Sequence, residues 1–424
     1  MMFRKLAIGV ATLLSVSLAS CATIAPNPND ENVSDFSQLE SRLDTLVTEG
    51  VMPGSVTYII ENGEVVFHHI NGYQDIQSNT PMQEKTLFRL YSMSKPITSV
   101  AIMMLHEEGK LSVDDPVSKY LPAFGDVKVY QSGPVDDMTL VNPDRPMTIG
   151  DLLAHKSGIT YHFTGETPVH QYYRKHGVKR DTPVGTRPTD GPPAKNLAEL
   201  TERLAQAPLL HQPGEKFSYS YSTTLLGQII EVVSNERLDK YLEKHLFAPL
   251  GMKDTGFFVT GEDLDRFVTN YLMTENGLKV IETRNNTDYK DMSRLLDGGG
   301  ALAGTAQDYL AFATMLANKG KYNGKQIIPA KAVDQLFAPQ ITIEDFGNDA
   351  PIDFGYGFAI GSPQTENINF MPAGTYGWAG SGNTLFWVNP QTHSVVLFMT
   401  QVITPPPFHK QVPFREYLID ATTE

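Results

Sequence analysis

Ser92 and Lys95 stand three residues apart in the run YSMSK, and Pro96 follows them directly. Proline is tolerated in a helix only in the first turn, where its missing N–H is not needed, so a helix is expected to begin close to Ser92. Residues i and i+3 share a helix face, which brings the Lys95 amine towards the Ser92 hydroxyl. A buried ammonium loses its proton readily, and a neutral amine is a competent base for a serine. The pair therefore predicts nucleophilic catalysis by Ser92.

A tyrosine is the next candidate. Tyr219 lies in a loop, within the stretch Pro213–Gly227, immediately before a predicted helix. Beside a lysine, a phenol can relay a proton, so Tyr219 is predicted to act with Lys95 as the general acid/base. The alternative is an amphipathic core tyrosine with a satisfied hydroxyl.

A glycine-rich segment, Tyr376–Thr384, precedes a predicted strand at Leu385–Val388. Glycine allows close backbone approach, so this segment is expected to line a cleft and to donate an N–H to an oxyanion. The backbone N–H of Ser92, at a helix N-terminus, favours negative charge in the same way. A structural glycine-rich turn would have the same composition.

In this order, the three segments resemble the serine β-lactamase and penicillin-binding-protein superfamily, most closely the class C β-lactamases and the family VIII carboxylesterases. The likeness spans residues from about 50 to 400 and includes the stretches Pro53–Val56, Asp151–Gly158 and Gly299–Tyr309. The resemblance implies that Ser92 is acylated, that Tyr219 is the base partner, and that the backbone N–H groups of Ser92 and Ser381 form the oxyanion hole.

Two substitutions distinguish this chain from the family pattern. Tyr221 stands where β-lactamases and D,D-peptidases have Asn, and Trp378-Ala379-Gly380 stands in place of Lys-Thr-Gly. The family's Lys helps to hold a substrate carboxylate, whereas an indole carries no charge. Tyr221, Trp378 and Gly380 are accordingly predicted to line the substrate pocket, and Trp378 favours an uncharged ester, as in the family VIII esterases.

Other site classes find no support. Lys156-Ser157-Gly158 is similar to the family's Lys-Thr-Gly motif, but it precedes Tyr219 in the sequence. It fits instead a segment of the family that is predicted to be structural. There is no Gly-x-Ser-x-Gly elbow and no His-Glu-x-x-His motif, and the 11 histidines show no ligand spacing. We expect no metal and no cofactor. A net charge of -14 without a Lys/Arg cluster argues against a nucleic-acid partner.

The N-terminus has the pattern of an export signal. Arg4 and Lys5 precede an apolar run, Leu6–Leu18, which is too short to span a membrane. Leu18-Ala19-Ser20-Cys21 resembles the bacterial lipobox, and Cys21 is the single cysteine of the sequence. Residues 1–20 are therefore predicted to be a lipoprotein signal peptide, and 21–36 a linker from a lipid anchor at Cys21. The implied location is the cell envelope, on the periplasmic side of a membrane.

The remaining sequence, 37–424, is predicted to be one catalytic domain. Asn62-Gly63 between two β-rich runs, Val56–Ile60 and Val65–Ile70, predicts a hairpin. Further predicted elements are helices over 196–207, 223–234, 305–320 and 412–420 and strands over 356–360, 384–388 and 394–401. Strands at both ends predict a mixed α/β fold of the β-lactamase/transpeptidase type. An antiparallel sheet lobe (37–125 and 295–424) would carry an inserted helical lobe (126–294).

The functional prediction is a serine hydrolase with an acyl-serine intermediate, acting on a short-chain or small ester. Three alternatives stay open: a D,D-peptidase or weak β-lactamase on a peptide-like substrate, an acyltransferase to an alcohol other than water, and a catalytically silent envelope-binding protein. The sequence does not determine an oligomeric state.

Overall fold

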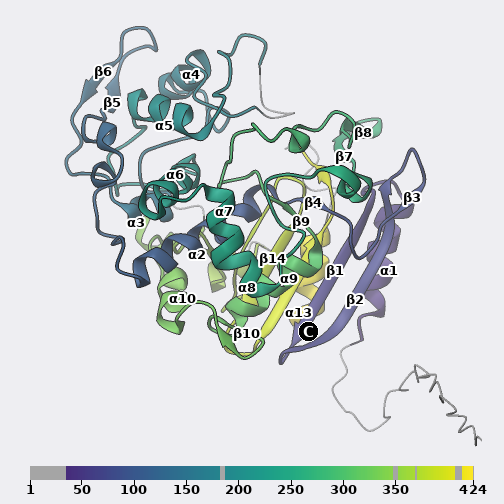
Figure 1. The fold of residues 1–424 in the computed structure, drawn as a ribbon. Helices are drawn as coiled ribbons and strands as arrows, with labels where there is room; N and C mark the ends of the chain where they lie inside the picture. The colour runs from purple at the N-terminus through teal and green to yellow at the C-terminus, as the bar shows by residue number, and fades with distance from the viewer. Residues whose placement is uncertain (1–34, 182–186, 347–351, 368–369, 406–412, 424) are drawn as a thin grey trace, which may run out of the picture. The chain divides into compact units, whose positions relative to one another are not determined.

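An antiparallel sheet assembled from both ends of the chain forms the centre of the computed structural model, which describes residues 35–181, 187–346, 352–367, 370–405 and 413–423. Within these residues the sheet has seven strands in the order β12-β13-β14-β15-β1-β2-β3 (Figure 1). The strands are β1 (Gly54–Glu61), β2 (Glu64–Asp75), β3 (Thr80–Pro81), β12 (Ala359–Ile360), β13 (Tyr376–Ala379), β14 (Leu385–Asn389) and β15 (Ser394–Met399). Because β1 pairs with β15, the predicted sheet built from both termini is confirmed, and with it the mixed α/β fold class.

The predicted hairpin is confirmed as β1 and β2. Asn62 and Gly63 join the strands with φ angles of +50° and +84°. Two positive φ angles are those of a type I′ turn, which Asn-Gly adopts readily and which matches the twist of the paired strands.

Helices cover both faces of the sheet. On one face, α1 (Ser37–Thr48) and α13 (Phe414–Thr423) share an apolar cluster with Trp387 and Phe398. On the other face, Tyr309 of α9 (Ala306–Ala317) packs edge-on against Phe386. The Tyr309 hydroxyl also donates a hydrogen bond to the carbonyl oxygen of Met93, 2.9 Å away. The sheet and α9 thus support the segment that carries Ser92.

The segment between the two halves of the sheet is largely helical and irregular, and α4, α5 and α6 lie together at the upper left of Figure 1. The helices of the chain not yet named are α2 (Ser94–Glu107), α3 (Ile149–Leu153), α4 (Pro168–Lys175), α5 (Leu197–Gln206), α6 (Ser222–Ser234), α7 (Leu238–Leu242), α8 (Ala248–Leu250), α10 (Ala330–Phe337), α11 (Ile343–Phe346) and α12 (Pro363–Asn367). Short 3₁₀ turns are η1 (Tyr91–Met93), η2 (Val117–Lys119), η3 (Pro122–Gly125), η5 (Gly261–Arg266) and η6 (Asp288–Lys290), and η4 (Glu243–Phe247) is a π-helical turn. The predicted helices are confirmed as α5, α6, α9 and α13.

Small sheets brace this region. They consist of β4 (Phe88–Arg89) with β9 (Ala303–Gly304), β5 (Val129–Ser132) with β6 (Thr139–Val141), β10 (Lys321–Tyr322) with β11 (Lys325–Gln326), and β7 (Asn270–Thr274) with β8 (Gly277–Glu282) and β16 (Val402–Ile403). The β4–β9 pair joins the chain just before Ser92 to the segment that follows the glycine turn at 298–300.

One predicted strand is shorter than expected. Of residues 356–360, only Ala359 and Ile360 pair with β13. Gly357 has a φ of +86°, a left-handed conformation that takes the chain out of the extended form. The strands predicted over 384–388 and 394–401 are confirmed as β14 and β15.

Residues Phe36–Glu424 form one compact unit, and the division of that unit into two lobes stays a prediction. The predicted signal peptide, Cys21 and all but the last two residues of the predicted linker lie outside the described residues. No helix within the described residues has both the length and the apolar character needed to cross a bilayer.

Candidate active site

Ser92 lies in the 3₁₀ turn η1, which runs directly into α2, and Pro96 falls in the first turn of that helix. The start of the helix is therefore where the proline predicts it. Ser92 is partly exposed, whereas the side chain of Lys95 is fully buried. The Ser92 hydroxyl is thus partly open to solvent, whereas the Lys95 amine beside it is shielded from bulk water.

Lys95 has three hydrogen-bond acceptors around its Nζ atom. Ser92 Oγ lies 3.5 Å away, the Tyr161 hydroxyl oxygen 3.0 Å, and the carbonyl oxygen of Gly299 2.6 Å. An ammonium group can donate to all three, while a neutral amine has two N–H donors and one lone pair. If a neutral Lys95 donated its two N–H groups to Tyr161 and Gly299, its lone pair would be left for Ser92. This geometry suits removal of the Ser92 proton.

Tyr219 and Trp378 meet beside this amine. The Lys95 Nζ atom lies 4.6 Å from the centre of the Tyr219 ring. From β13, the Trp378 indole Nε1–H donates to the Tyr219 hydroxyl oxygen at 3.3 Å. Tyr219 precedes α6, so three separate elements bring Ser92, Lys95, Tyr219 and Trp378 into one group.

Tyr221, the other predicted pocket tyrosine, is only 1% exposed. Its ring packs edge-on against Tyr161 with centroids 4.4 Å apart, and its hydroxyl shares a hydrogen bond with His162 Nδ1 at 2.9 Å. Burial raises the pKa of Tyr221 well above its ordinary value. The structure thus places Tyr221 behind Tyr161, a partner of Lys95, and any influence on substrate would pass through that ring.

The predicted oxyanion segment packs closely against the residues before Ser92. A Cβ atom at Gly380 would lie 2.4 Å from the Leu90 carbonyl oxygen, and one at Gly382 would lie 3.2 Å from the Tyr91 ring. Ser381 between them is exposed. Among the described residues, no carbonyl oxygen accepts a hydrogen bond from the backbone N–H of Ser92 or Ser381. The oxyanion role assigned to both groups stays a prediction.

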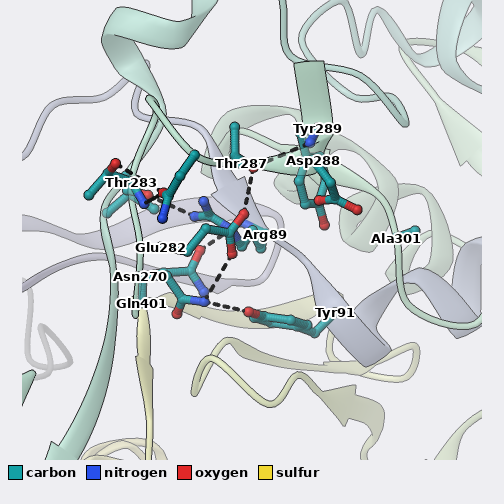
Figure 2. Close-up of polar contacts among 12 residues, drawn as sticks. Arg89, Tyr91, Asn270, Glu282, Thr283, Thr287, Asp288, Tyr289, Ala301 and Gln401 are labelled. Carbon is teal, nitrogen blue, oxygen red and sulfur yellow. Dashed lines mark hydrogen bonds and ion pairs between the residues drawn. The ribbon is translucent and has the colours of Figure 1, made fainter. Parts of the chain in front are cut away.

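Tyr91 holds an unusual conformation next to the nucleophile. Its φ is +46°, which is rare for a bulky residue and persists only where the surroundings impose it. Figure 2 shows those surroundings: Asn270 lies between Tyr91 and Glu282, and its Nδ2 donates to the Tyr91 hydroxyl at 2.7 Å. Behind it, Arg89 Nε pairs with Glu282 Oε2 at 3.0 Å, both side chains being less than 10% exposed.

The Arg89–Glu282 pair has further polar partners, although Arg89 Nη2 is buried without a hydrogen bond to any described residue. Burial alone would raise the pKa of Glu282, but the Arg89 charge and a hydrogen bond from Thr287 bring it below its usual value. Arg89 Nη1 also donates to the Val268 carbonyl at 2.7 Å, and the Gln401 side chain accepts from the Arg89 backbone N–H at 2.7 Å. These contacts hold Arg89 and Tyr91, which lie just before Ser92 in the chain.

His155, from the segment predicted to be structural, lies beneath Tyr219 with ring centroids 4.9 Å apart. Its Nδ1 shares a hydrogen bond with Ser220 Oγ at 3.1 Å. Burial, and secondly the nearby Lys95 charge, hold the pKa of His155 well below its ordinary value. A neutral imidazole in this position adds no positive charge beneath the site.

One potential metal-ligand group occurs in the described part of the chain, far in sequence from the site residues. Glu40, Asp44 and His69 offer ligand atoms within 4.8 Å of one another. The two acids are exposed, and His69 Nε2 is already within 2.9 Å of Asp44 Oδ1. This is the geometry of a hydrogen-bonded surface contact.

Two partners of Lys95 were not predicted. Tyr161 follows the Asp151–Gly158 segment without any motif of its own, and Gly299 contributes through a backbone carbonyl, which no side-chain pattern reveals. The one available signal was the run of three glycines from Gly298 to Gly300.

Comparison with known proteins agrees with this geometry. Residues 39–419 match the family model described as Beta-lactamase. Protein Rv1367c of Mycobacterium tuberculosis is 30% identical over 364 residues, covering 83% of this chain and 86% of that protein. Esterase EstB of Burkholderia gladioli is 28% identical over 387 residues, covering 86% and 91%. The solved structure of EstCE1, described as a hydrolase with promiscuous acyltransferase activity, has a TM-score of 0.75 at 25% identity and covers 91% of this chain and 98% of its own. The predicted resemblance is confirmed, and the chain belongs to the beta-lactamase family of serine hydrolases.

Proposed function

We propose that this chain hydrolyses short-chain or otherwise small carboxylic esters through a covalent acyl-Ser92 intermediate. The observation that carries the proposal is the Trp378 indole, which donates to the Tyr219 hydroxyl at 3.3 Å. It stands where the family's β-lactamases and D,D-peptidases have a cationic Lys. A single uncharged N–H donor on an apolar ring favours a neutral ester over a substrate that carries a carboxylate.

Acylation follows from the contacts of Lys95. Ser92 Oγ attacks the ester carbonyl carbon while its proton passes to the Lys95 amine. The negative charge that develops on the carbonyl oxygen is expected to face the backbone N–H groups of Ser92 and Ser381. When the carbon–oxygen bond to the alcohol breaks, a proton delivered through Tyr219 neutralises the leaving alkoxide, and an acyl-Ser92 ester remains.

Deacylation uses the same groups in the opposite sense. Water attacks the acyl-Ser92 carbonyl carbon and gives its proton to the Lys95–Tyr219 pair. The bond to Ser92 Oγ breaks, the serine recovers a proton, and the carboxylic acid departs. The net reaction converts the ester and water into a carboxylic acid and an alcohol.

A groove of about 780 Å³ borders Tyr219 and has Phe217, Leu210 and Val129 among its lining residues. This size is within the usual range for small-molecule sites. Polar residues such as Gln212, Glu215 and Lys216 share the lining with these apolar ones, so the groove offers space beside Tyr219 for part of a small ester.

Hydrolysis of p-nitrophenyl butyrate by the wild type and by Ser92→Ala tests the proposal. Turnover should disappear in Ser92→Ala, together with labelling by a fluorophosphonate probe, while the melting temperature is kept. Ser99→Ala is a matched control, because Ser99 is a buried serine on the helix that follows Ser92 and should leave both readouts unchanged. Retained turnover in Ser92→Ala would rule out the assignment.

Acyl transfer to an alcohol other than water is the second candidate. EstCE1 is described as a hydrolase with promiscuous acyltransferase activity, and the same acyl-Ser92 intermediate would serve both reactions. Adding an alcohol acceptor to the butyrate assay and measuring the ratio of ester to acid formed distinguishes the two.

The remaining alternatives have direct tests. A D,D-peptidase or weak β-lactamase would form a Ser92 adduct with a fluorescent penicillin, detectable by mass spectrometry. A silent binding protein would leave the fluorophosphonate probe unreacted. We expect the probe to react and the penicillin to react poorly, because Trp378 offers its carboxylate no cation.

We also infer that the protein is exported and anchored through lipid at Cys21. The support is the charged, apolar and small-residue order of the first 21 residues. Labelling with radioactive palmitate in a bacterial host should be lost in Cys21→Ala. Labelling that persists in this variant would contradict the inference.

A further inference from the structure

The turn at Asp297–Gly300 supplies the closest partner of Lys95. The Gly299 carbonyl oxygen lies 2.6 Å from Lys95 Nζ, nearer than either Tyr161 or Ser92. The direction of this carbonyl therefore influences how the Lys95 amine is oriented towards Ser92.

Asp297 ties this turn to its neighbours through both carboxylate oxygens. Oδ1 accepts hydrogen bonds from Thr224 Oγ1 at 2.6 Å and from the Gly299 backbone N–H at 2.7 Å. Oδ2 pairs with Arg180 Nε at 2.8 Å. The Asp297 side chain is only 2% exposed, so these contacts form away from bulk water.

The turn packs so closely that neither Gly298 nor Gly299 has room for a side chain. A Cβ atom on Gly299 would lie 3.0 Å from both Asp297 Oδ1 and Thr224 Oγ1, and one on Gly298 would lie 2.8 Å from Thr98 Oγ1. Thr98 belongs to α2, the helix of Lys95, and its hydroxyl donates to the Gly298 carbonyl at 2.7 Å. The turn is thus held between α2 and α6, and Arg180 reaches it from a third segment.

We propose that Asp297, held by Arg180 and Thr224, is a positioning residue that aims the Gly299 carbonyl at Lys95 and so fixes the amine against Ser92. This inference rests on the proposed function, in which Lys95 takes the Ser92 proton. Asp297 touches neither Ser92 nor Lys95, so its effect is indirect. A displacement of about 1 Å in a reacting group can cost about 100-fold in rate, which sets the scale of the expected effect.

Asp297→Asn tests the proposal with little change in shape. It removes the charge that Arg180 neutralises and puts an N–H₂ group where one of the two oxygens accepts. With p-nitrophenyl butyrate we expect kcat to fall by about 10- to 100-fold while KM changes by less than about twofold, because substrate contacts are untouched. The rate of fluorophosphonate labelling should fall in parallel with kcat.

Thr224 offers an independent pair of variants should Asp297→Asn fold poorly. Thr224→Val keeps the shape of the side chain and removes its hydroxyl, whereas Thr224→Ser keeps the hydroxyl. We expect Thr224→Val to lower kcat and Thr224→Ser to restore most of it, a rescue that depends on the hydrogen bond to Asp297.

Asp190→Asn is the matched control. Asp190 forms a similar buried ion pair with Lys179 at 2.9 Å, and the two side chains are 2% and 1% exposed. Lys179 directly precedes Arg180 in the chain. Breaking it should lower the melting temperature and leave kcat within about twofold of wild type, since Asp190 has no contact with the turn.

The outcomes separate the two proposals. If Asp190→Asn and Asp297→Asn lowered kcat equally for the same loss of stability, the positioning role of Asp297 would be wrong. The proposed function would still stand. An active wild type whose kcat is unchanged by both Asp297→Asn and Thr224→Val would overturn the positioning role in the same way. A wild type that neither hydrolyses the ester nor takes the probe would overturn the proposed function, and this inference with it.

Discussion

The Lys95 Nζ atom donates to the Tyr161 hydroxyl oxygen across 3.0 Å, whereas the Tyr219 hydroxyl accepts its hydrogen bond from Trp378. The two tyrosines nearest the amine are therefore held differently. Tyr161 is buried, whereas Tyr219 is partly exposed. We therefore expect the two hydroxyls to contribute differently to catalysis.

We expect Tyr219→Phe to lower kcat for p-nitrophenyl butyrate by about 10²- to 10⁴-fold, the usual range for loss of a general acid/base. Tyr161→Phe removes only an acceptor that orients Lys95, so its kcat should fall less. Both variants keep their rings and should keep their melting temperatures within a few degrees. A larger loss in Tyr161→Phe would transfer the acid/base role to Tyr161.

Replacing Trp378 tests the basis of substrate choice. Trp378→Lys puts a cation where the family's β-lactamases have one, so labelling by a fluorescent penicillin should become faster and kcat/KM for the butyrate ester should fall. Trp378→Phe is the control for lost size, because it keeps an aromatic ring but has neither N–H nor charge. If Trp378→Lys and Trp378→Phe react with penicillin at the same rate, charge at this position does not decide the preference.

The cluster behind Tyr91 predicts a large stability effect (Figure 2). Glu282→Gln leaves the Arg89 charge buried without its carboxylate, and breaking a buried ion pair in this way costs about 3–5 kcal/mol. Urea unfolding measures the difference. Glu64→Gln, on the exposed hairpin, should change the free energy of unfolding by less than about 0.5 kcal/mol. An equally small change in Glu282→Gln would mean that the pair adds nothing.

The features predictable from the sequence are those with a local cause. Pro96 marks the helix start, Asn62-Gly63 marks the hairpin turn, and the i, i+3 spacing puts Lys95 beside Ser92, all within a few residues. Each depends on backbone rules that apply regardless of the rest of the chain.

The remaining parts of the site depend on long-range packing. Tyr161 and Gly299 reach Lys95 from 66 and 204 residues away, and no local spacing encodes such contacts. Tyr91, with its positive φ, is likewise hydrogen-bonded through its hydroxyl to Asn270, which is 179 residues distant. Residues 356–358 have an extended-strand composition, yet Gly357 turns the chain and the strand begins later.

His155 predicts how stability depends on pH. Its pKa in the folded protein lies well below the ordinary value of 6.5, first because of burial and then because of the Lys95 charge. Below about pH 6.5 the unfolded chain therefore binds a proton that the folded chain does not, and stability falls as the pH falls. The pKa of His170 is also lowered by burial, so His170 adds to the same trend. Replacing His155 should thus make the acid-side loss smaller without abolishing it.

Thermal melting of the wild type and His155→Phe between pH 7.5 and 5 tests this expectation. Phenylalanine keeps a ring under Tyr219 but binds no proton, so the melting temperature of the variant should be lower at pH 7.5, where the Ser220 hydrogen bond is lost, and should decline less steeply on acidification. Equal slopes in His155→Phe and the wild type would show that His155 is protonated to the same extent in the folded and unfolded states, against the burial that the structure gives it.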